Sequence, residues 1–200
     1  MTKPDPYHKI ARALEHAAPG SSDFDLNPDV DLPENRKLRA AGVLVPLLQS
    51  GTGLHVILTK RSSALRHHPG QIAFPGGNVD DTDDGVAAAA LREAHEEIGL
   101  APSNVEIIGT LPHHETVTGF TVTPVVGRVL AAFDPVPEPG EVQEVFTVPL
   151  VHFSDPANFQ IQSRHWRGQQ RFFYVAPYGP YYVWGATARI LRGLSDRLNR

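Results

Sequence analysis

The chain has 200 residues, a net charge of −4 at pH 7 and 41% hydrophobic residues, which suits one ordinary globular domain. This charge gives no support for binding to nucleic acid or an anionic membrane, and no apolar run approaches the roughly 18 residues of a membrane span. The absence of cysteine excludes disulfides, a thiolate nucleophile and a cysteine-based zinc site. Because the N-terminus also lacks an apolar signal core, we expect a cytoplasmic protein.

The first 36 residues are expected to form a helix and an arm that precede the main domain, which we place at residues 37–200. Residues 7–18 predict a short amphipathic helix. Its apolar positions recur at helical spacing: Ile10, Ala13, Leu14 and Ala17. Residues 19–36 are rich in Pro, Asp and Ser and predict a loop or an ordered arm. This part of the chain could pack on the core or help to form a homodimer.

A hairpin is predicted next. Residues 41–49 form a continuous apolar run, interrupted by Pro46, which is typical of a buried strand. Residues 50–53 have the composition of a turn, and residues 54–59 return as a second apolar strand.

The segment of residues 60–77 carries a cluster of basic side chains. They are Lys60, Arg61, Arg66, His67 and His68. Because arginine pairs bidentately with phosphate, this segment is a candidate phosphate-binding loop. A solvated surface loop would have the same composition, so charge alone leaves both interpretations open.

Residues 74–100, FPGGNVDDTDDGVAAAALREAHEEIGL, predict a glycine-rich loop followed by a helix from Val86 to Ile98. Asp83 or Asp84 is expected to cap the helix, and Gly99 to end it in a left-handed conformation. One helix face should be buried against a sheet. Its residues are Ala87, Ala90, Leu91, Ala94 and Ile98.

Three glutamates lie off this apolar face. Glu93, Glu96 and Glu97 are spaced by three and four residues, so we expect their carboxylates to converge. Acidic groups near a helix C-terminus oppose the helix dipole by about 0.3–1 kcal/mol each. Bound divalent cations would turn this repulsion into binding energy, and the glycine-rich loop could add a carbonyl ligand. An acidic surface cluster is the alternative.

The order Gly77, Asp83 and Arg92-Glu93-Ala94-x-Glu96-Glu97-x-Gly99-Leu100 resembles the Nudix box of the Nudix hydrolases. Asp83 stands where the family usually has glutamate, and one extra residue separates it from Arg92. Asp84 has the usual spacing, so the sequence leaves both aspartates open for this role. The resemblance implies an α/β Nudix fold, a mixed central sheet sandwiched between helices with a loop–helix–loop catalytic motif, and Mg²⁺ or Mn²⁺ as cofactor.

An upstream pattern narrows the resemblance. Leu58-Thr59-Lys60-Arg61-Ser62, then Arg66, Gly70 and Phe74-Pro75-Gly76-Gly77, resembles the signature of the coenzyme A diphosphatase branch of this family. The resemblance implies hydrolysis of coenzyme A and its derivatives to 3′,5′-ADP and (acyl-)4′-phosphopantetheine, with Arg61 or Arg66 on the 3′-phosphate. A diphosphatase for another nucleoside diphosphate derivative, such as ADP-ribose, and a non-catalytic nucleotide-binding module are the alternatives.

The resemblance also implies roles for single residues. We expect the metal ligands to be Glu93, Glu96, Glu97 and the carbonyl of Gly76. Glu141 is expected to act as a late-loop acid, and Arg92 to hold the carboxylates of the box. The general base stays open among Glu93, Glu96 and Glu141. Substrate contacts are expected from Lys60, Arg61, Arg66, His67 and Gly77.

The rest of the chain predicts further strands and one helix. The strands are residues 105–111, 120–129 and 142–148, and the helix is residues 185–198. We interpret His113, His114 and Glu115 as residues of a loop rather than as a metal site. Residues 160–174 contain arginines beside Trp166 that could stack an adenine, but two exposed strand faces are the favoured interpretation. Trp184 is interpreted as a core residue.

Overall fold

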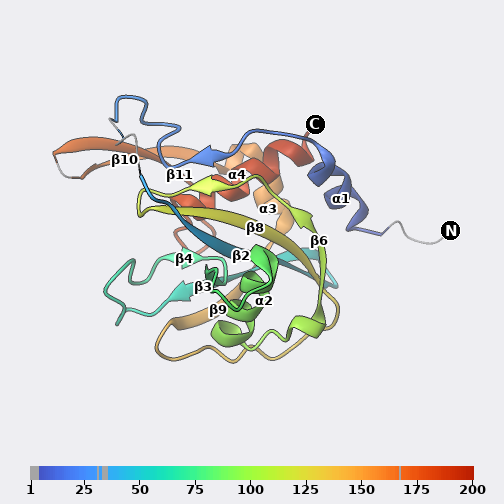
Figure 1. Ribbon diagram of the computed structural model, residues 1–200. Helices are drawn as coiled ribbons and strands as arrows, with labels where there is room; N and C mark the ends of the chain where they lie inside the picture. The colour runs from blue at the N-terminus through green and yellow to red at the C-terminus, as the bar shows by residue number, and fades with distance from the viewer. Residues whose placement is uncertain (1–4, 31, 33–35, 167) are drawn as a thin grey trace.

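The structure is a computed structural model that describes residues 5–30, 32, 36–166 and 168–200. Within these residues, nine strands form one mixed sheet that lies between helices (Figure 1). The predicted α/β architecture is therefore confirmed. No helix in this described part of the chain combines the length and the apolar composition that crossing a membrane requires.

The long strand β2 (Arg39–Ser50) is the centre of the sheet. It runs parallel to β8 (Phe120–Val129) and pairs antiparallel with β3 (Gly53–Arg61), which pairs in turn with β9 (Val142–Pro149). The predicted hairpin and the later strands are thus confirmed, with small shifts at their ends. The shorter strands are β1 (Ser21–Ser22), β4 (Ile72–Ala73), β5 (Gly76–Asn78), β6 (Val105–Thr110) and β7 (His114–Glu115).

Helix α2 (Gly85–Ile98) covers one face of the sheet. The predicted apolar face is confirmed, because Ala90, Ala94 and Ile98 are buried against the sheet and their apolar neighbours on the helix pack on the same cluster. The helix comes close to β2 at Gly42, where a Cβ atom would lie 2.2 Å from the carbonyl oxygen of Val86. Gly99 ends the helix as predicted, with φ 72° and its N–H donated to the last turn.

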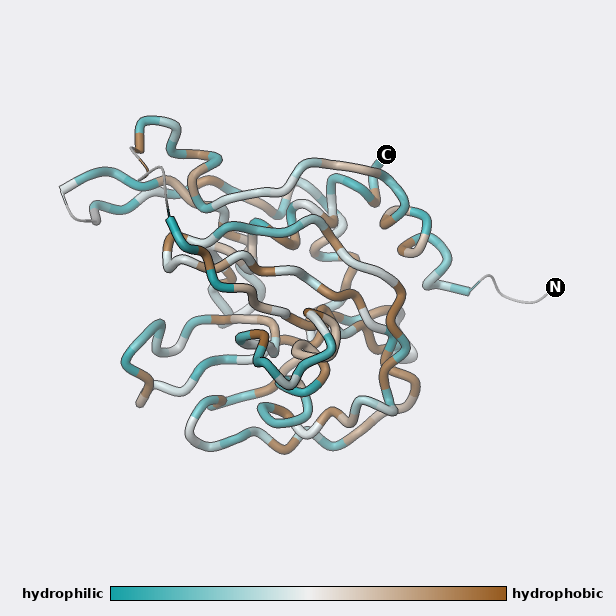
Figure 2. The backbone as a smooth tube through the Cα atoms, viewed as in Figure 1, coloured by the Kyte–Doolittle hydropathy of each residue, from teal (hydrophilic) through white to brown (hydrophobic). Residues whose placement is uncertain are grey.

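Three helices cover the opposite face: α1 (His8–Glu15), α3 (Leu150–Ser154) and α4 (Ala186–Leu198). They share one large core with the sheet, to which α1 contributes Ile10 and Ala13. Two short 3₁₀ helices, η1 (Pro102–Asn104) and η2 (Pro156–Asn158), join elements at the edge. Figure 2 shows hydrophobic residues concentrated in the central strands and hydrophilic residues along the projecting loops.

The N-terminal arm is joined to the sheet. Its strand β1 pairs in parallel with β7, and the buried side chain of His114 on β7 lies between Ser21 and Asp23. The Nδ1 atom of His114 is 2.9 Å from Ser21 Oγ, and Nε2 is 3.1 Å from Asp23 Oδ1. His114 therefore holds the arm against the sheet. The expected loop at residues 113–115 is corrected, because His114 and Glu115 form β7. The division at residue 36 stays a prediction.

Strands β10 (Gln160–Trp166) and β11 (Gln169–Val175) form a separate antiparallel ribbon that projects from the body (Figure 1, upper left). Most of the ribbon's described side chains are exposed, which confirms the interpretation of two exposed strand faces. The loop after β3 projects on the same side of the view.

Candidate active site

Two adjacent glycines of β5 bring the glycine-rich loop against helix α2. Gly76 lies opposite Val43 of β2 with φ 154°, and a Cβ atom there would lie 2.4 Å from the carbonyl oxygen of Gly42. A Cβ atom on Gly77 would lie 2.3 Å from Oε1 of Glu93. Glycine is therefore required at residue 76 for pairing with the sheet and at residue 77 for contact with the glutamate.

Glu97 is the most buried acid of the site. Its side chain accepts a hydrogen bond from the backbone N–H of Gly76 at 3.1 Å, and only 4% of the residue is exposed. Burial raises the pKa of Glu97 to about 7, and the negative charges of Glu93 and Glu141 act in the same direction. The Gly76 N–H and the charge of Arg61 oppose this rise in pKa. Arg61 and Glu141 therefore both lie within electrostatic reach of Glu97.

Arg92 connects the acidic groups. Its Nε and one terminal nitrogen donate to the two oxygens of Asp83, each at 2.9 Å. Its other terminal nitrogen donates to Glu93 at 3.0 Å and to Glu96 at 3.1 Å. These bonds lower the pKa of Asp83 and fix the position of the Glu93 carboxylate. Arg92 thus has the geometry of the expected holding role.

The contact with Arg92 distinguishes the two candidate aspartates. Asp83 faces the guanidinium group, whereas Asp84 is exposed. The prediction that one of them caps the helix is wrong, because the N-cap residue Asp84 makes no side-chain cap bond. Asp83 instead accepts bonds from Arg92 and from the backbone N–H of Asp80. Arg92 binds both oxygens of the Asp83 carboxylate, which therefore does not cap the helix.

The three glutamates of the helix are not equivalent. The expected convergence of all three carboxylates is not seen, and no group of three metal-ligating side chains is preformed among the described residues. Glu96 is exposed and bound to Arg92, while Glu97 is turned toward Gly76. Glu93 is mostly buried, and burial raises its pKa despite the nearby Arg92. The nearby cations therefore do not fully neutralise the carboxylates of Glu93 and Glu97, whose pKa values are both raised.

The carboxylate oxygens of Glu93, Glu96 and Glu97 fit a hard divalent cation, which prefers oxygen ligands. The carbonyl of Gly76 adds a candidate ligand. Gly76 and Asn78 occupy alternate positions of β5, where backbone groups point away from β2. The Asn78 carbonyl accepts a bond from Arg92 at 3.1 Å, so this edge of β5 faces the helix acids. The Gly76 carbonyl points the same way.

The basic residues expected to contact substrate are distributed over two faces of the sheet. Lys60 and Arg61 belong to the end of β3 rather than to a loop. Lys60 lies opposite Glu144 and Arg61 opposite Val142, with a register shift between the two. Since paired residues share a face, Arg61 points toward the α2 side, where Val142 is buried. Lys60 points toward the α4 side, and Arg66 and His67 are exposed in the following loop.

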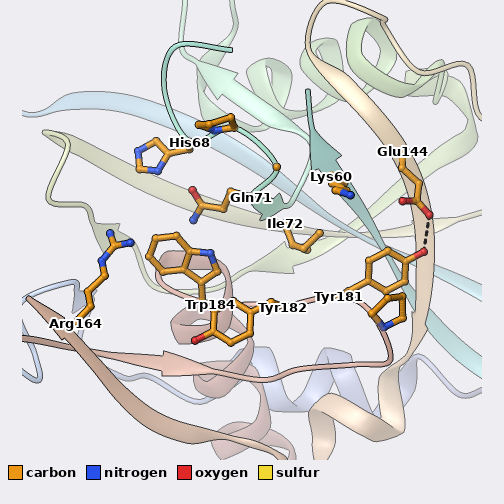
Figure 3. A pocket seen from close by; sticks show the side chains of 12 residues that line it. Lys60, His68, Gln71, Ile72, Glu144, Arg164, Tyr181, Tyr182 and Trp184 are labelled. Atoms are coloured by element: carbon orange, nitrogen blue, oxygen red, sulfur yellow. Dashed lines mark hydrogen bonds between the residues drawn. The ribbon is translucent and has the colours of Figure 1, made fainter. Parts of the chain in front are cut away.

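A pocket of about 510 Å³ lies on the α4 side of Lys60 (Figure 3). It is bounded by the end of β3, the loop before β4, strand β10 and residues 180–184. The interpretation of Trp184 as a core residue is corrected, because its half-buried ring forms one wall. The guanidinium carbon of Arg164 lies 4.5 Å from the centre of that ring. No sequence pattern indicated that Trp184 and Lys60 would line the same pocket.

Comparison with known proteins adds independent evidence. A family model of the NUDIX domain matches residues 38–168. A relative from Enterobacter sp., named uncharacterized Nudix hydrolase NudL, is 46% identical over 158 residues, covering 78% of this chain and 81% of the relative. Its namesake from Escherichia fergusonii is 43% identical over 171 residues, covering 85% and 88%.

Solved structures show the same fold. A MutT/nudix family protein from Enterococcus faecalis matches with a TM-score of 0.51 at 17% identity, covering 100% of this chain and 76% of that one. The Nudix hydrolase RenU from M. smegmatis matches with a TM-score of 0.50 at 22% identity, covering 60% and 82%. The chain therefore belongs to the Nudix hydrolase family, whose members act on nucleoside diphosphate derivatives and generally use divalent metal ions.

Proposed function

We propose that the protein hydrolyses the diphosphate bond of coenzyme A and its derivatives, releasing 3′,5′-ADP and (acyl-)4′-phosphopantetheine. The choice of substrate rests on the resemblance of residues 58–77 to the coenzyme A diphosphatase signature. The observation that carries the proposal is that this one segment supplies both Arg61, which lies within electrostatic reach of Glu97, and the two glycines that contact Glu93 and Glu97.

Glu93 and Glu97 are proposed to hold Mg²⁺ or Mn²⁺, with Glu96 and the Gly76 carbonyl as further ligands. When bound, such an ion neutralises charge on the diphosphate and activates water for attack. Glu96 would have to leave Arg92 to take part, which its exposed position permits. Arg92 would keep Glu93 in place through its simultaneous bonds to Asp83.

Glu141 is proposed as the late-loop acid. Its charge raises the pKa of both Glu93 and Glu97, which supports a position facing the helix acids. Its backbone carbonyl accepts a bond from Ser62 at 2.8 Å, so the loop that carries it is joined to the end of β3. Glu141 therefore remains a candidate for the general base beside Glu93 and Glu96.

Arg61 is proposed to bind the diphosphate, because it lies on the side of the helix acids. The backbone of Gly77, which lies against Glu93, is proposed to contact the substrate, with the exposed Arg66 adding positive charge and His67 a polar contact beside it. A diphosphate bears negative charge that arginine neutralises through paired hydrogen bonds. A homodimer stays a prediction, which light scattering of the purified chain would test.

The test is to incubate the purified chain with coenzyme A and Mg²⁺ or Mn²⁺ and to identify the products by mass. We expect 3′,5′-ADP and 4′-phosphopantetheine, and a lower kcat/KM for ADP-ribose in a parallel assay. Glu97→Gln should reduce turnover by orders of magnitude, whereas Glu15→Gln, an exposed glutamate of α1, should retain it. A higher kcat/KM for ADP-ribose than for coenzyme A would contradict the proposed substrate and favour the alternative class.

A further inference from the structure

We propose that the pocket beside Lys60 binds the 3′-phosphoadenosine half of the substrate, with Trp184 stacking on the adenine and the positive charges of Lys60 and Arg164 favouring the 3′-phosphate. This inference rests on the proposed function and adds a location for one end of the substrate. We call the cavity the Trp184 pocket; it is lined by Lys60, His68, Pro69, Gly70, Gln71, Ile72, Glu144, Arg164, Pro180, Tyr181, Tyr182 and Trp184.

The Trp184 pocket lies next to the proposed reaction site. Lys60 lines the pocket, and the following residue, Arg61, acts on Glu97 from the other face of the sheet. The two side chains point to opposite faces of the sheet, but the regions meet at His68, which lines the pocket and lies within electrostatic reach of Arg61. In coenzyme A the diphosphate and the 3′-phosphate are carried by the same ribose. A substrate bound around the end of β3, where Arg61 is the last residue, would place one phosphate on each side of the strand.

The walls of the pocket suit a planar base with a phosphate. Trp184 offers an indole ring, and Arg164 packs over it and over Phe173, at 4.5 and 5.8 Å from the ring centres. Aromatic side chains commonly hold an adenine by stacking on the face of its ring. The two fixed cations, Lys60 and Arg164, approach the pocket from different elements, β3 and β10 (Figure 3).

The acid in the pocket offsets only part of this charge, because the described residues that line the pocket include a single carboxylate and two cations. Glu144 is the only carboxylate among the described lining residues, and it accepts a hydrogen bond from the hydroxyl of Tyr181 at 2.5 Å. The Tyr181 ring is in turn stacked on Phe146, with ring centres 3.6 Å apart. Glu144 is thus fixed at one end of the pocket, and Arg164 lies at the other, as Figure 3 shows.

His68 adds a polar wall to the pocket. It is the only non-glycine residue with a positive φ in the described part of the chain, at 54°, an uncommon conformation for a residue with a side chain. Burial and the neighbouring Arg61 lower the pKa of His68, which favours the neutral imidazole. A neutral imidazole both donates and accepts hydrogen bonds, as the base and the ribose require.

The other half of coenzyme A fits these walls less well. Phosphopantetheine beyond its phosphate is an uncharged chain with two amides, and it offers no flat ring to Trp184 and no anion to two cations. The pocket volume lies within the range of ordinary small-molecule sites, roughly 300–1,000 Å³. Arg61 and Arg66, the sequence candidates for the 3′-phosphate, do not line the pocket.

The stacking can be measured directly. The chain contains two tryptophans, so Trp166→Phe leaves Trp184 as the single tryptophan fluorophore. This variant is titrated with 3′,5′-ADP, 5′-AMP and 4′-phosphopantetheine, without divalent ions. We expect both adenine nucleotides to quench the emission of Trp184, with a Kd for 3′,5′-ADP about tenfold lower than that for 5′-AMP. We expect 4′-phosphopantetheine to leave the emission unchanged.

Lys60→Gln in the same background should remove the preference for 3′,5′-ADP over 5′-AMP, whereas Lys9→Gln, a matched change on an exposed lysine of α1, should retain it. Circular dichroism of each variant confirms folding, and Arg164→Gln provides a second test of the same preference. Absence of quenching, quenching by 4′-phosphopantetheine, or a preference unchanged by both variants would overturn the inference. The hydrolysis assay on the unsubstituted chain decides the proposed function separately.

Discussion

The carboxylate of Glu93 rests on the backbone of Gly77, at a distance that leaves no room for a Cβ atom on residue 77. Gly77→Ala would place a methyl group 2.3 Å from Oε1 of Glu93, so the glutamate must move. We expect kcat/KM to fall about a hundredfold, because small displacements of catalytic groups have effects of this size. Gly51→Ala, in an open turn where the new methyl group meets nothing within 4 Å, is the matched control. Full activity of Gly77→Ala would show that the position of Glu93 does not matter for catalysis.

The two aspartates before helix α2 allow a paired test of the box acid. Asp83→Asn removes the charge that Arg92 binds at both oxygens, while Asp84→Asn changes an exposed group. We expect Asp83→Asn to lower activity about 10- to 100-fold, as is usual for residues that orient metal ligands. Asp84→Asn should have almost no effect. The reverse order in a steady-state assay would assign the role to Asp84.

The raised pKa of Glu97 predicts how the stability of the metal-free protein changes with pH. Its pKa in the folded chain is about 7, raised by burial above the ordinary value of 4.5. The folded state therefore holds this proton more tightly than the unfolded state, and stability falls as pH rises from about 4.5 to about 7. The change is on the order of 3 kcal/mol.

The measurement compares chemical denaturation of the unsubstituted chain with that of Glu97→Gln across this pH window. The variant lacks the titrating group, so its stability should decrease less with pH, while contributions from Glu93 remain in both proteins. Added Mg²⁺ or Mn²⁺ should stabilise the unsubstituted chain most at the upper end of the window, because a cation competes with the proton. Parallel curves for the two proteins would show that Glu97 does not carry the perturbed pKa.

The contact between His114 and Asp23 predicts that the N-terminal arm contributes to the stability of the fold. His114 is fully buried, and Asp23 accepts a bond from the backbone N–H of Val117 in addition to its contact with the imidazole. Asp23→Asn should lower the free energy of unfolding by about 1–3 kcal/mol, the usual effect of removing a charged partner from a buried polar group. Asp29→Asn, on an exposed residue of the same arm, should change it little. Equal stability of the two variants would mean that the arm is not fixed by this contact.

Sequence patterns predicted the local structure well and the side-chain partners poorly. The apolar periodicity and Gly99 located helix α2, and continuous apolar runs located the central strands, because these signals act within a few residues. The spacing of Glu93, Glu96 and Glu97 fixed only their positions on the helix. Their directions depend on Arg92, which binds Glu93 and Glu96, and on Gly76, which binds Glu97. Spacing alone could not predict how these partners divide the three carboxylates.

The Trp184 pocket lay beyond sequence reasoning for a different reason. Its walls come from segments about a hundred residues apart, the end of β3 with the loop before β4 on one side and Arg164 with residues 180–184 on the other. Alternation along β3 sets the side to which Lys60 points, but it does not identify the segments that pack there.

Gly42 shows how a residue outside the site can control it. It contacts none of the acids, yet the absence of a side chain there allows β2 and α2 to approach until the Val86 carbonyl fills the space. A methyl group at residue 42 would push the whole helix outward and carry Glu93, Glu96 and Glu97 away from the glycine loop as one body. A substitution at Gly42 is therefore expected to lower activity from behind the helix, through a residue that contacts none of the three glutamates.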